Sequence, residues 1–468
     1  MGRAGTGAPP NILFILSDEH AWNALGCYGH PTVRTPHLDR LSGQGWTFDN
    51  AYCNSPMCVP SRLSLLSGRW CWQIGGWDNG IIPDGGYTTW GHRLSALGYE
   101  TVLCGRTHFC GSDRLHGFER RLCDDLESWL PECGQAPDRT PGWRRGSNSH
   151  VTESGPGEHV QIEYDAEIAE RGEAFLRGKA RQPGSRPWLL YCGFMHPHFP
   201  LIAPPDLYRA YEASPAPAPT GWNAPLDEQH PVIRHLRWSF RNDEPLDPGT
   251  QRRATLSYWS LVTQLDRNVG RLLEALDSTS LRDNTAVIYV SDHGEMAGAF
   301  GIWQKQCFYE DSVRVPMMMR LPSHLDGGDE PGRVPENVSL IDLQPTLLDL
   351  ARGSDSQAPG ASLVGIARAR QPAPCRTVFS EYHAQGMLRG GFMVKSGRHK
   401  YCYYVGDSPQ LYDLERDPRE ERDLAADRAY VDVRRSLEAG LRRIVDPESV
   451  DLAARRDQAR RRGETLAM

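Results

Sequence analysis

Four short apolar runs in this chain each end in polar side chains suited to catalysis. The runs are Ile12–Leu16, Thr101–Leu103, Leu189–Met195 and Ala286–Val290. Continuous apolar runs of this length are typical of strands buried on both faces, as in a parallel sheet between two layers of helices. Ligands bind such sheets beyond the carboxyl ends of the strands. The runs therefore predict an α/β fold with a functional site at one edge of the sheet.

The segments that follow the four runs predict which side chains share that edge. They are Ser17–His20, Gly105–His108, His196–His198 and Ser291–Glu295. Apolar residues recur at helical spacing between the runs, which predicts the flanking helices. These helical segments are His37–Gly43, Trp90–Leu97, Tyr164–Arg177, Ala254–Leu276 and Leu340–Ala351.

A cysteine lies at the centre of a second feature, the stretch Asn54–Arg69 (N-S-P-M-C-V-P-S-R-L-S-L-L-S-G-R). A helix is predicted from Arg62 to Leu66, with Pro60 at or near its first turn, where a missing N–H costs nothing. Cys58 would then lie just ahead of a helix N-terminus, among free N–H groups that favour an anion. Taken alone, an unpaired cysteine is more often a small buried hydrophobe.

The segment C-V-P-S-R at Cys58–Arg62, with S-G-R at Ser67–Arg69, resembles the signature of type I sulfatases. The resemblance extends from Asn11 to about Ala425. It implies an alkaline-phosphatase-like α/β sandwich, with a large mixed, mostly parallel central sheet flanked by helices. It also implies that a formylglycine-generating maturation enzyme oxidises Cys58 to Cα-formylglycine.

Asp18 and Asp292 are candidate metal ligands, because hard carboxylates select an oxygen-loving divalent cation. Each aspartate by itself could equally cap a helix or a turn. The sulfatase resemblance implies one divalent metal ion held by Asp18, Cys58, Asp292 and His293. Calcium is favoured, with manganese or magnesium as alternatives, and the role of Glu19 is left open. The Asp-His form at 292–293 is similar to choline sulfatases and phosphonate monoester hydrolases.

The remaining site residues also come from the resemblance. Gly105–His108 resembles a G-K-W-H segment with arginine in place of lysine, and Pro197–Pro200 matches a P-H-x-P element. Lys305 lies at the position of a lysine that follows the D-H-G-E segment. The resemblance implies catalytic roles for Cys58, Arg62, Arg106, His108, His198 and Lys305, and a substrate-binding role for Asn79.

The implied reaction is the hydrolysis of a sulfate monoester to an alcohol and inorganic sulfate. A hydroxyl of the formylglycine hydrate attacks sulfur, with the sulfate oxygens held by the metal, Arg62, Lys305 and Arg106. His198, with Lys305 nearby, protonates the departing alcohol. His108 takes the proton of the remaining hydroxyl, so that sulfate leaves and the aldehyde is restored. The alternatives are a phosphonate monoester or phosphodiester hydrolase, and a non-catalytic metal-binding protein with unconverted Cys58.

Composition limits the partners and the location. The formal net charge of −7 excludes a globally basic nucleic-acid binder, and no apolar run approaches membrane-spanning length. The short polar segment before Asn11 leads into a strand and not into a secretory signal. The 12 cysteines show no dense framework, so we expect them to be mostly reduced. These features predict a cytoplasmic enzyme that acts on a small-molecule sulfate ester.

The pattern changes beyond residue 370, which predicts a catalytic domain over residues 1–370 and a smaller α+β subdomain over 371–468. Short strands, which suit an antiparallel sheet, are predicted at Thr377–Tyr382, Gly391–Lys395, His399–Tyr404 and Gln410–Leu414. A helix around Ala429–Ile444 follows. We expect the charged tail with Arg460–Arg462 to be solvated or to contact another copy in a homo-oligomer.

Two long segments rich in Gly, Pro, Trp and charge, Pro131–His159 and Ser214–Pro248, have few strand signals. Long loops of this kind in a compact enzyme either shape a pocket or are disordered. The first of these alternatives predicts that they select the alcohol group, with the help of Trp143, Trp222 or Trp238.

Overall fold

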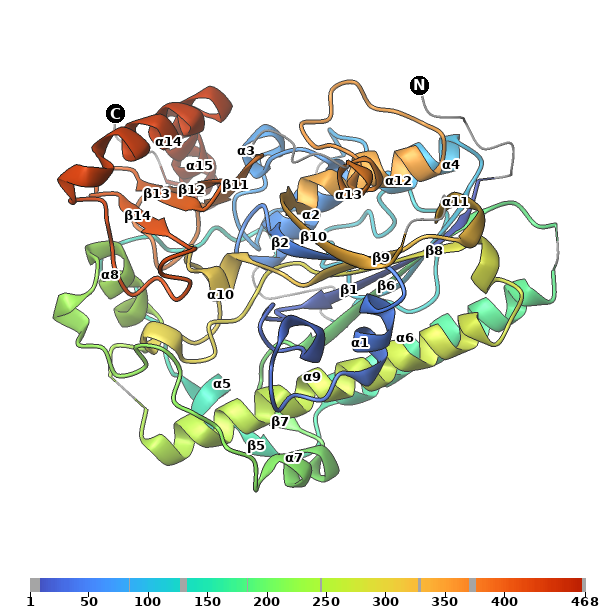
Figure 1. Cartoon of the computed structure of the whole chain (residues 1–468). Coiled ribbons are helices and arrows are strands. Elements are labelled where there is room, and N and C mark those ends of the chain that lie inside the picture. The colour runs from blue at the N-terminus through green and yellow to red at the C-terminus, as the bar shows by residue number, and fades with distance from the viewer. Residues whose placement is uncertain are drawn as a thin grey trace.

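The centre of the fold is an eight-stranded mixed sheet in the order β10-β2-β9-β8-β1-β6-β3-β4 (Figure 1). The computed structural model describes residues 9–83, 85–126, 133–182, 184–244, 246–326, 330–369 and 376–464. The strands of this sheet are β1 (Asn11–Asp18), β2 (Trp46–Tyr52), β3 (Glu100–Gly105), β4 (Arg120–Arg121), β6 (Trp188–Pro197), β8 (Thr285–Ser291), β9 (Met317–Arg320) and β10 (Gly332–Ser339). β9 alone pairs antiparallel with its neighbours β2 and β8.

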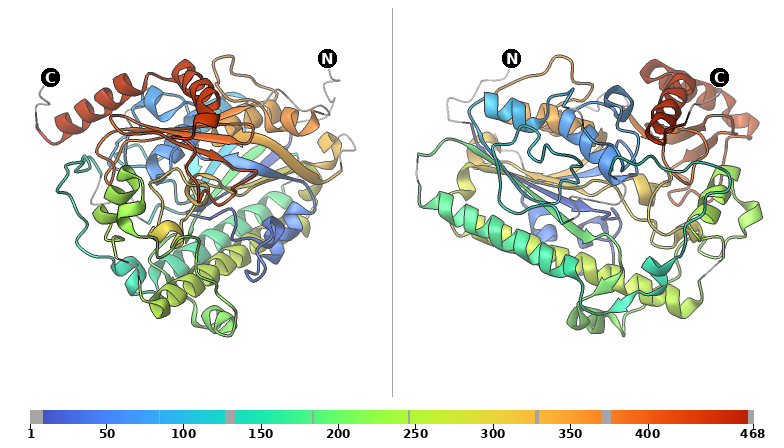
Figure 2. Two further views of the ribbon diagram at one scale, coloured as in Figure 1. Left: turned by 60° about the vertical axis from the view of Figure 1, so that its left-hand side comes forward. Right: turned by 180° about the vertical axis from the view of Figure 1, so that it is seen from behind.

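Helices cover both faces of this sheet (Figures 1 and 2). On one face lie α1 (Pro36–Ser42), α6 (Val160–Ala180) and the long α9 (Pro248–Asp277). On the other lie α2 (Cys58–Ser67), α4 (Trp90–Ala96), α12 (Leu343–Leu350) and α13 (Leu363–Arg368). The predicted helices are thus confirmed, although α2, α6 and α9 each begin at least four residues earlier than expected.

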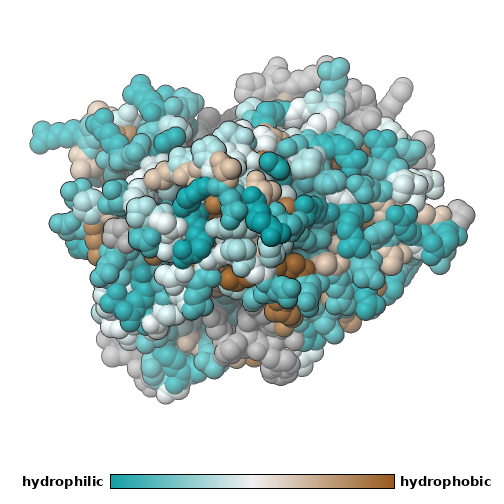
Figure 3. All heavy atoms as spheres, turned by 90° about the horizontal axis from the view of Figure 1, so that it is seen from below, coloured by the Kyte–Doolittle hydropathy of each residue, from teal (hydrophilic) through white to brown (hydrophobic). Residues whose placement is uncertain are grey.

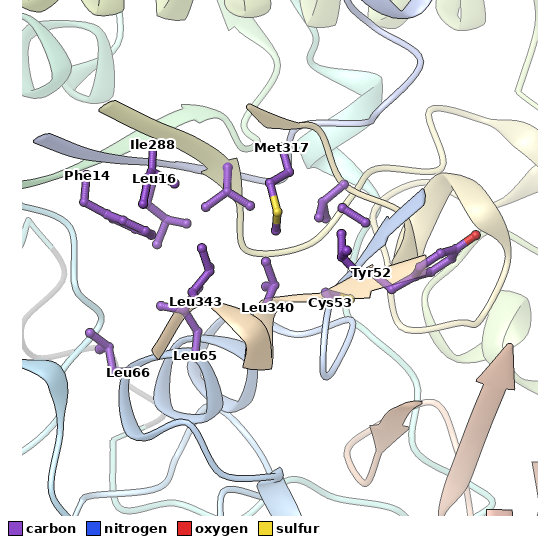
Figure 4. Close-up of a cluster of buried hydrophobic side chains, with 14 of the residues drawn as sticks. Phe14, Leu16, Tyr52, Cys53, Leu65, Leu66, Ile288, Met317, Leu340 and Leu343 are labelled. Atoms are coloured by element: carbon purple, nitrogen blue, oxygen red, sulfur yellow. The ribbon is translucent and has the colours of Figure 1, made fainter. Parts of the chain in front are cut away.

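The central strand β1 contributes to both cores by simple alternation, because successive side chains point to opposite faces. Ile12, Phe14 and Leu16 belong to the core on the α2 side, whereas Leu13 and Ile15 belong to the core on the α9 side. Figure 4 shows Phe14 and Leu16 with Ile288 of β8 facing the leucines of α2 and α12. This burial on both faces explains why the run contains no polar residue before Ser17.

The four strands predicted from the apolar runs are β1, β3, β6 and β8, and all four are confirmed. They are adjacent in the sheet in the order β8-β1-β6-β3, and each pair among these neighbours is parallel. Their carboxyl ends therefore share one edge, as the sequence pattern predicted. The expectation of a mixed, mostly parallel sheet is confirmed as well.

Three strands on the other side of the sheet were not predicted from the sequence. β10 is an edge strand with exposed residues at Gly332, Arg333 and Pro335, so its apolar pattern is interrupted. β2 carries Asp49 and Asn50 in its middle, both only partly buried. In β10 and β2, polar side chains on partly exposed positions remove the continuous apolar signal that identified the central strands. The third strand, β9, is fully buried but only four residues long, so its apolar run is too short to identify a strand.

A second, antiparallel sheet follows in the order β11-β12-β13-β14. Its strands are β11 (Thr377–Tyr382), β12 (Gly391–Ser396), β13 (His399–Tyr404) and β14 (Gln410–Asp413), which confirms the strands predicted there. The predicted helix corresponds to α14 (Val431–Ile444). The predicted domain boundary near residue 370 lies outside the described residues, and the two-domain division stays a prediction.

The expectation of a charged C-terminal tail is corrected, because Pro447–Arg461 forms helix α15 (Figure 2). The Asp446 side chain accepts a hydrogen bond from the N–H of Ser449, and Pro447 occupies the first turn, which are strong helix-start signals. Val450 and Ala454 are buried in a core shared with β12 and α14. Few apolar residues suffice to dock this helix, so its sequence resembled a solvated tail.

The two long segments are also more ordered than expected where they are described. They contain α5 (Ser149–Thr152), β5 (Gly155–Pro156) and α8 (Pro231–Ser239). One disulfide joins Cys110 to Cys133, and the expectation of mostly reduced cysteines is confirmed for the described residues apart from this pair. The other cysteines in the described residues are free.

Further short elements complete the chain. They are α3 (Cys71–Ile74), α7 (Pro205–Tyr211), α10 (Glu310–Val313), α11 (Ser323–Asp326), β7 (Ile202–Ala203) and the 3-10 turns at Gly26–Tyr28, Leu226–Glu228, Arg282–Asn284, Ala299–Gly301, Leu340–Asp342 and Arg428–Tyr430. Within the described residues, no helix has the length and apolar character that crossing a membrane requires. The face seen in Figure 3 is mostly hydrophilic, with apolar residues in small separate spots.

Candidate active site

Four buried side chains with metal-binding atoms converge at the carboxyl ends of β1 and β8. Their ligand atoms all lie within 4.8 Å of one another, and the residues are Asp18, Cys58, Asp292 and His293. Cys58 Sγ lies 3.2 Å from His293 Nε2 and 3.7 Å from Asp18 Oδ1. His293 Nε2 lies 3.6 Å from one carboxylate oxygen of each aspartate. The four residues predicted as ligands are thus neighbours in space.

The second oxygen of each aspartate is held by arginine side chains. Arg62 donates from Nε to Asp292 Oδ2 at 2.8 Å and from Nη2 to Asp18 Oδ2 at 3.0 Å, and all three side chains are fully buried. Arg106 Nε donates to the same Asp18 oxygen at 2.6 Å. Burial opposes ionisation of Asp18, but the charges of Arg106 and Arg62 outweigh it and hold its pKa well below its ordinary value. Both arginines therefore keep Asp18 an anion.

Helix α2 presents Cys58 from its first turn. Cys58 is its first residue, and Met57 with extended backbone precedes it, so the helix begins four residues earlier than the sequence predicted. Ser61 Oγ donates to the carbonyl oxygen of Asp292 at 2.6 Å, which fixes this turn against the end of β8. Burial, and then the nearby charge of Asp18, raises the pKa of the Cys58 thiol above its ordinary value. As an unmodified cysteine, this residue favours the neutral thiol.

The segment after β3 brings Arg106 and His108 to the cluster. Arg106 Nη2 lies 3.1 Å from His108 Nδ1. His108 has a φ of 62°, which is uncommon for a residue other than glycine. The carboxylate of Asp125 accepts hydrogen bonds from the N–H groups of Thr107 and His108 and from Thr107 Oγ1. Asp125 thus holds the turn in place, a role for which no sequence signal existed.

Lys305 and His198 meet at the carboxylate of Glu19. Lys305 Nζ donates to Glu19 Oε2 at 2.9 Å, and His198 Nε2 lies 3.4 Å from the same oxygen. Burial raises the pKa of Glu19 despite the opposing charge of Lys305. His196 instead pairs with Asp165 at 2.7 Å, away from this group. Glu19, whose role the sequence left open, is therefore part of the site.

Asn79 lies beside the helix that carries Cys58. Its side-chain Oδ1 accepts a hydrogen bond from the N–H of Val59 at 3.1 Å. It also lines a cavity of about 160 Å³ together with Trp143. Trp222 and Trp238 are absent from the residues that line this cavity, and Trp238 lines a different one. Of the three tryptophans proposed to select the alcohol, the structure brings Trp143 alone to Asn79.

The donor set fits a divalent cation. His293 Nδ1 lies 3.1 Å from the carbonyl oxygen of Gly294, so this nitrogen carries the proton and Nε2 presents its lone pair to the cluster. Asp18 and Asp292 each direct Oδ1 to the cluster while Oδ2 bonds to arginine. Two carboxylates, one imidazole and one sulfur atom in a buried cluster are a plausible donor set for such an ion.

Comparison with protein families places most of the chain in one family. The family model described as Sulfatase matches residues 10–354. The model described as N-sulphoglucosamine sulphohydrolase, C-terminal, matches residues 298–446. Together the two matches cover both the central sheet and the C-terminal sheet.

Individual relatives and a solved structure agree with this placement. The chain is 33% identical over 476 residues to a choline-sulfatase of Rhizobium meliloti (strain 1021), covering 97% of this chain and 91% of the relative. It is 29% identical over 471 residues to arylsulfatase K of Gallus gallus, covering 93% and 82%. The crystal structure of a phosphonate monoester hydrolase of Agrobacterium radiobacter superposes with a TM-score of 0.75 at 24% identity and covers 96% of each chain, which shows a shared fold.

Proposed function

The chain belongs to the sulfatase family and is a sulfuric ester hydrolase, and we propose that its reaction takes place at Asp18, Cys58, Asp292 and His293. As a sulfatase, it hydrolyses sulfate monoesters to an alcohol and inorganic sulfate. In our proposal, these four residues hold one divalent cation, and residue 58 acts as Cα-formylglycine made from Cys58. Calcium is the metal proposed, with manganese or magnesium as alternatives.

The observation that carries this proposal is the convergence of the four side chains. They come from two strand ends and the first turn of α2, and their ligand atoms lie within 4.8 Å of one another. A bound divalent cation supplies positive charge next to residue 58 and to the sulfate oxygens. The nearby residues Arg62, Arg106 and Lys305 provide further fixed positive charge.

The arginines and the lysine have different parts in the proposal. Arg62 donates from Nε, Nη1 and Nη2 to protein acceptors and is fully buried, so it orients Asp18 and Asp292. Among the described residues, Lys305 pairs with the carboxylate of Glu19 and lies 5.1 Å from the ring centre of Phe199. We assign Lys305 to the sulfate oxygens, because a preset charge stabilises the negative charge that develops in the transition state.

The proton donor in the proposal is His198. Its Nδ1 donates to the carbonyl oxygen of Phe199 at 2.6 Å, so the ring must take up a second proton at Nε2 before Nε2 can protonate the departing alcohol oxygen. Glu19 Oε2 lies 3.4 Å from that Nε2 and orients it. His108 is the base, and Arg106 with Asp125 holds it beside Asp18.

Mass spectrometry of residue 58 tests the proposal directly. The protein is produced in a host with the maturation enzyme, and trypsin releases the peptide Leu41–Arg62. We expect an aldehyde at position 58 in the active preparation and no turnover of an aryl sulfate by Cys58→Ala. An active preparation with only cysteine at this position would refute the formylglycine mechanism.

A second activity, hydrolysis of phosphonate monoesters, is the alternative suggested by the shared fold with a phosphonate monoester hydrolase. Steady-state kcat/KM values on an aryl sulfate and on the matching aryl phosphonate separate the two. The sulfatase assignment predicts the higher value on the sulfate. The cytoplasmic location, the maturation partner and a homo-oligomer stay predictions from the sequence.

A further inference from the structure

The cavity beside Asn79 is connected to the segment of the reacting residue through Asn79 itself. Asn79 lines this cavity. Its side chain also accepts a hydrogen bond from the N–H of Val59, the residue that follows Cys58. One wall is the turn Asp78–Gly80, and the opposite wall is the segment 135–138. If the alcohol group of a sulfate ester at residue 58 extends past Asn79, it enters this cavity. The positions of these walls therefore limit the size of the alcohol group that the cavity can hold.

A single guanidinium from the C-terminal helix α15 bridges the two walls. Arg461 Nη1 donates to Asp78 Oδ1 at 3.1 Å and to the carbonyl oxygen of Gln135 at 2.8 Å. Arg461 Nη2 pairs with the other oxygen of Asp78. The Asp78 carboxylate is 1% exposed and the Arg461 side chain 12%. Breaking a buried pair of this kind is costly because it leaves a charge without compensation.

Neighbouring residues of α15 bind to the same two walls. Gln458 Nε2 donates to Asp78 Oδ2 at 3.0 Å. Arg462 Nη1 donates to the carbonyl oxygen of Pro137 at 2.8 Å. The Asp78 carboxylate also accepts a hydrogen bond from the N–H of Gly80 at 3.0 Å, so it fixes the turn that contains Asn79. The position of Asn79 thus depends on a helix some 380 residues later in the chain.

We propose that Arg461 is a positioning residue that sets the shape of the alcohol subsite beside Asn79 and so limits the enzyme to sulfate esters of small alcohols. This proposal rests on the function proposed above. A cavity of about 160 Å³ is comparable to one of about 150 Å³ that holds benzene, so it admits an alcohol group of about that size. A sulfated disaccharide is larger than this, so we expect walls fixed in this way to disfavour it.

The test compares Arg461→Met with the conservative Arg461→Lys and with Arg460→Ala as a matched control. The Arg460 side chain is 78% exposed and pairs only with Asp457 in the structure as described. The measured quantity is the ratio of kcat/KM for 4-nitrophenyl sulfate to kcat/KM for a sulfated disaccharide. The inhibition constant of inorganic sulfate is measured in parallel, because sulfate has no alcohol group and reports only on the reacting half of the site.

We expect Arg461→Met to lower the ratio by about tenfold or more, a size typical of changed pocket contacts. Arg461→Lys should lie between it and the wild type, and Arg460→Ala should match the wild type. The inhibition constant of sulfate should stay the same in all four proteins. If Arg461→Met fails to fold, Asp78→Asn removes the same ion pair and should give the same change.

Two results would overturn the role of Arg461. One is an unchanged ratio in folded Arg461→Met, whether or not the variant loses thermal stability. The other is a sulfate inhibition constant that worsens in step with the ester KM, which would show a general disturbance of the site. If the wild type hydrolyses no sulfate ester at all, the proposed function itself fails, and that outcome is distinct from both.

Discussion

At the scale of single residues, the two oxygens of each aspartate in the ligand cluster have different partners. Asp18 and Asp292 each give one oxygen to the ligand cluster and the other to Arg62, which is fully buried. For Asp18, burial alone would favour protonation, but the charges of Arg106 and Arg62 keep the carboxylate ionised. The guanidinium of Arg62 therefore fixes the positions of both carboxylates and also balances negative charge in the cluster.

Removal of the metal is expected to destabilise the protein, because two buried carboxylate oxygens of the cluster then face each other without a cation. A ligand at a free concentration of 100 times its Kd stabilises a folded protein by about 2.7 kcal/mol, and a chelator that removes the ligand removes this stabilisation. We expect excess EDTA to lower Tm and calcium or manganese to restore it. Asp292→Asn serves as the control and should respond less. An unchanged Tm of the wild type after EDTA treatment contradicts a bound cation.

The carboxylate of Asp125 gives a second prediction at this scale. Asp125→Ala removes the acceptor of three hydrogen bonds that hold Thr107 and His108. Because misplacement of a catalytic group by about 1 Å costs about 10²-fold in rate, we expect a loss of that order in kcat/KM. Exposed Asp124 provides the control, since Asp124→Ala leaves these bonds intact. Equal activities of the two variants on an aryl sulfate would rule out this role for Asp125.

At the scale of elements, helices on one face of the sheet are fixed by side chains that cap a neighbour. The Asp266 side chain of α9 accepts hydrogen bonds from the N–H groups of His37 at 3.2 Å and Leu38 at 2.8 Å, both in the first turn of α1. These are N–H groups that a helix cannot satisfy within itself. Burial raises the pKa of Asp266 to about 7, although both hydrogen bonds lower it. The two helices are thus joined by a carboxyl group that titrates near neutrality.

The raised pKa predicts a pH dependence of stability. The folded pKa of Asp266 exceeds its unfolded value, so the stability it contributes is fully present below about pH 4. It is lost as the pH rises through about 7. We expect Asp266→Asn to gain stability relative to the wild type between pH 5 and pH 8 (about the range of this titration), measured as the difference in Tm. A difference that is constant over this range would contradict the shift.

At the scale of the whole molecule, a buried lysine joins the C-terminal sheet to the central sheet. Lys400 of β13 lies 3.0 Å from Glu310 Oε1 of α10, and it also pairs with Glu420. Tyr52 at the end of β2 donates to the other Glu310 oxygen at 2.9 Å. The lysine side chain has no exposed surface. The two sheets are therefore held together by charges that water does not screen.

Lys400→Met is expected to leave Glu420 buried without its counter-ion and Glu310 with Arg314 alone. Breaking a buried pair by removing one partner typically costs about 3–5 kcal/mol. We expect a loss of this size in the free energy of unfolding, measured by urea denaturation. Arg435→Ala is the control, because this side chain is 75% exposed and its loss should change stability by no more than about 0.5 kcal/mol. Equal urea midpoints for the two variants would contradict the role of Lys400.

The central strands and the ligand cluster could be predicted because their signals are local. A strand buried on both faces needs an unbroken apolar run, and β1, β3, β6 and β8 all have one. The segments around Cys58, Asp292 and His198 match a family pattern by spacing alone. For these parts of the chain, short stretches of sequence contain the whole signal, and their meeting at one sheet edge follows from parallel pairing.

Only the tertiary structure showed the parts that depend on distant partners. Asp125 acts on the turn at His108, Glu19 meets Lys305 and His198, and Arg461 reaches across to Asp78. None of these pairs has a fixed spacing along the chain, and Asp125, Asp78 and Arg461 each resemble an ordinary charged residue. By itself, the sequence determined the four central strands and indicated which residues gather around Cys58, because burial and family spacing are local properties. The folded chain decided what holds those residues in place, because charge pairing between distant segments has no local signature.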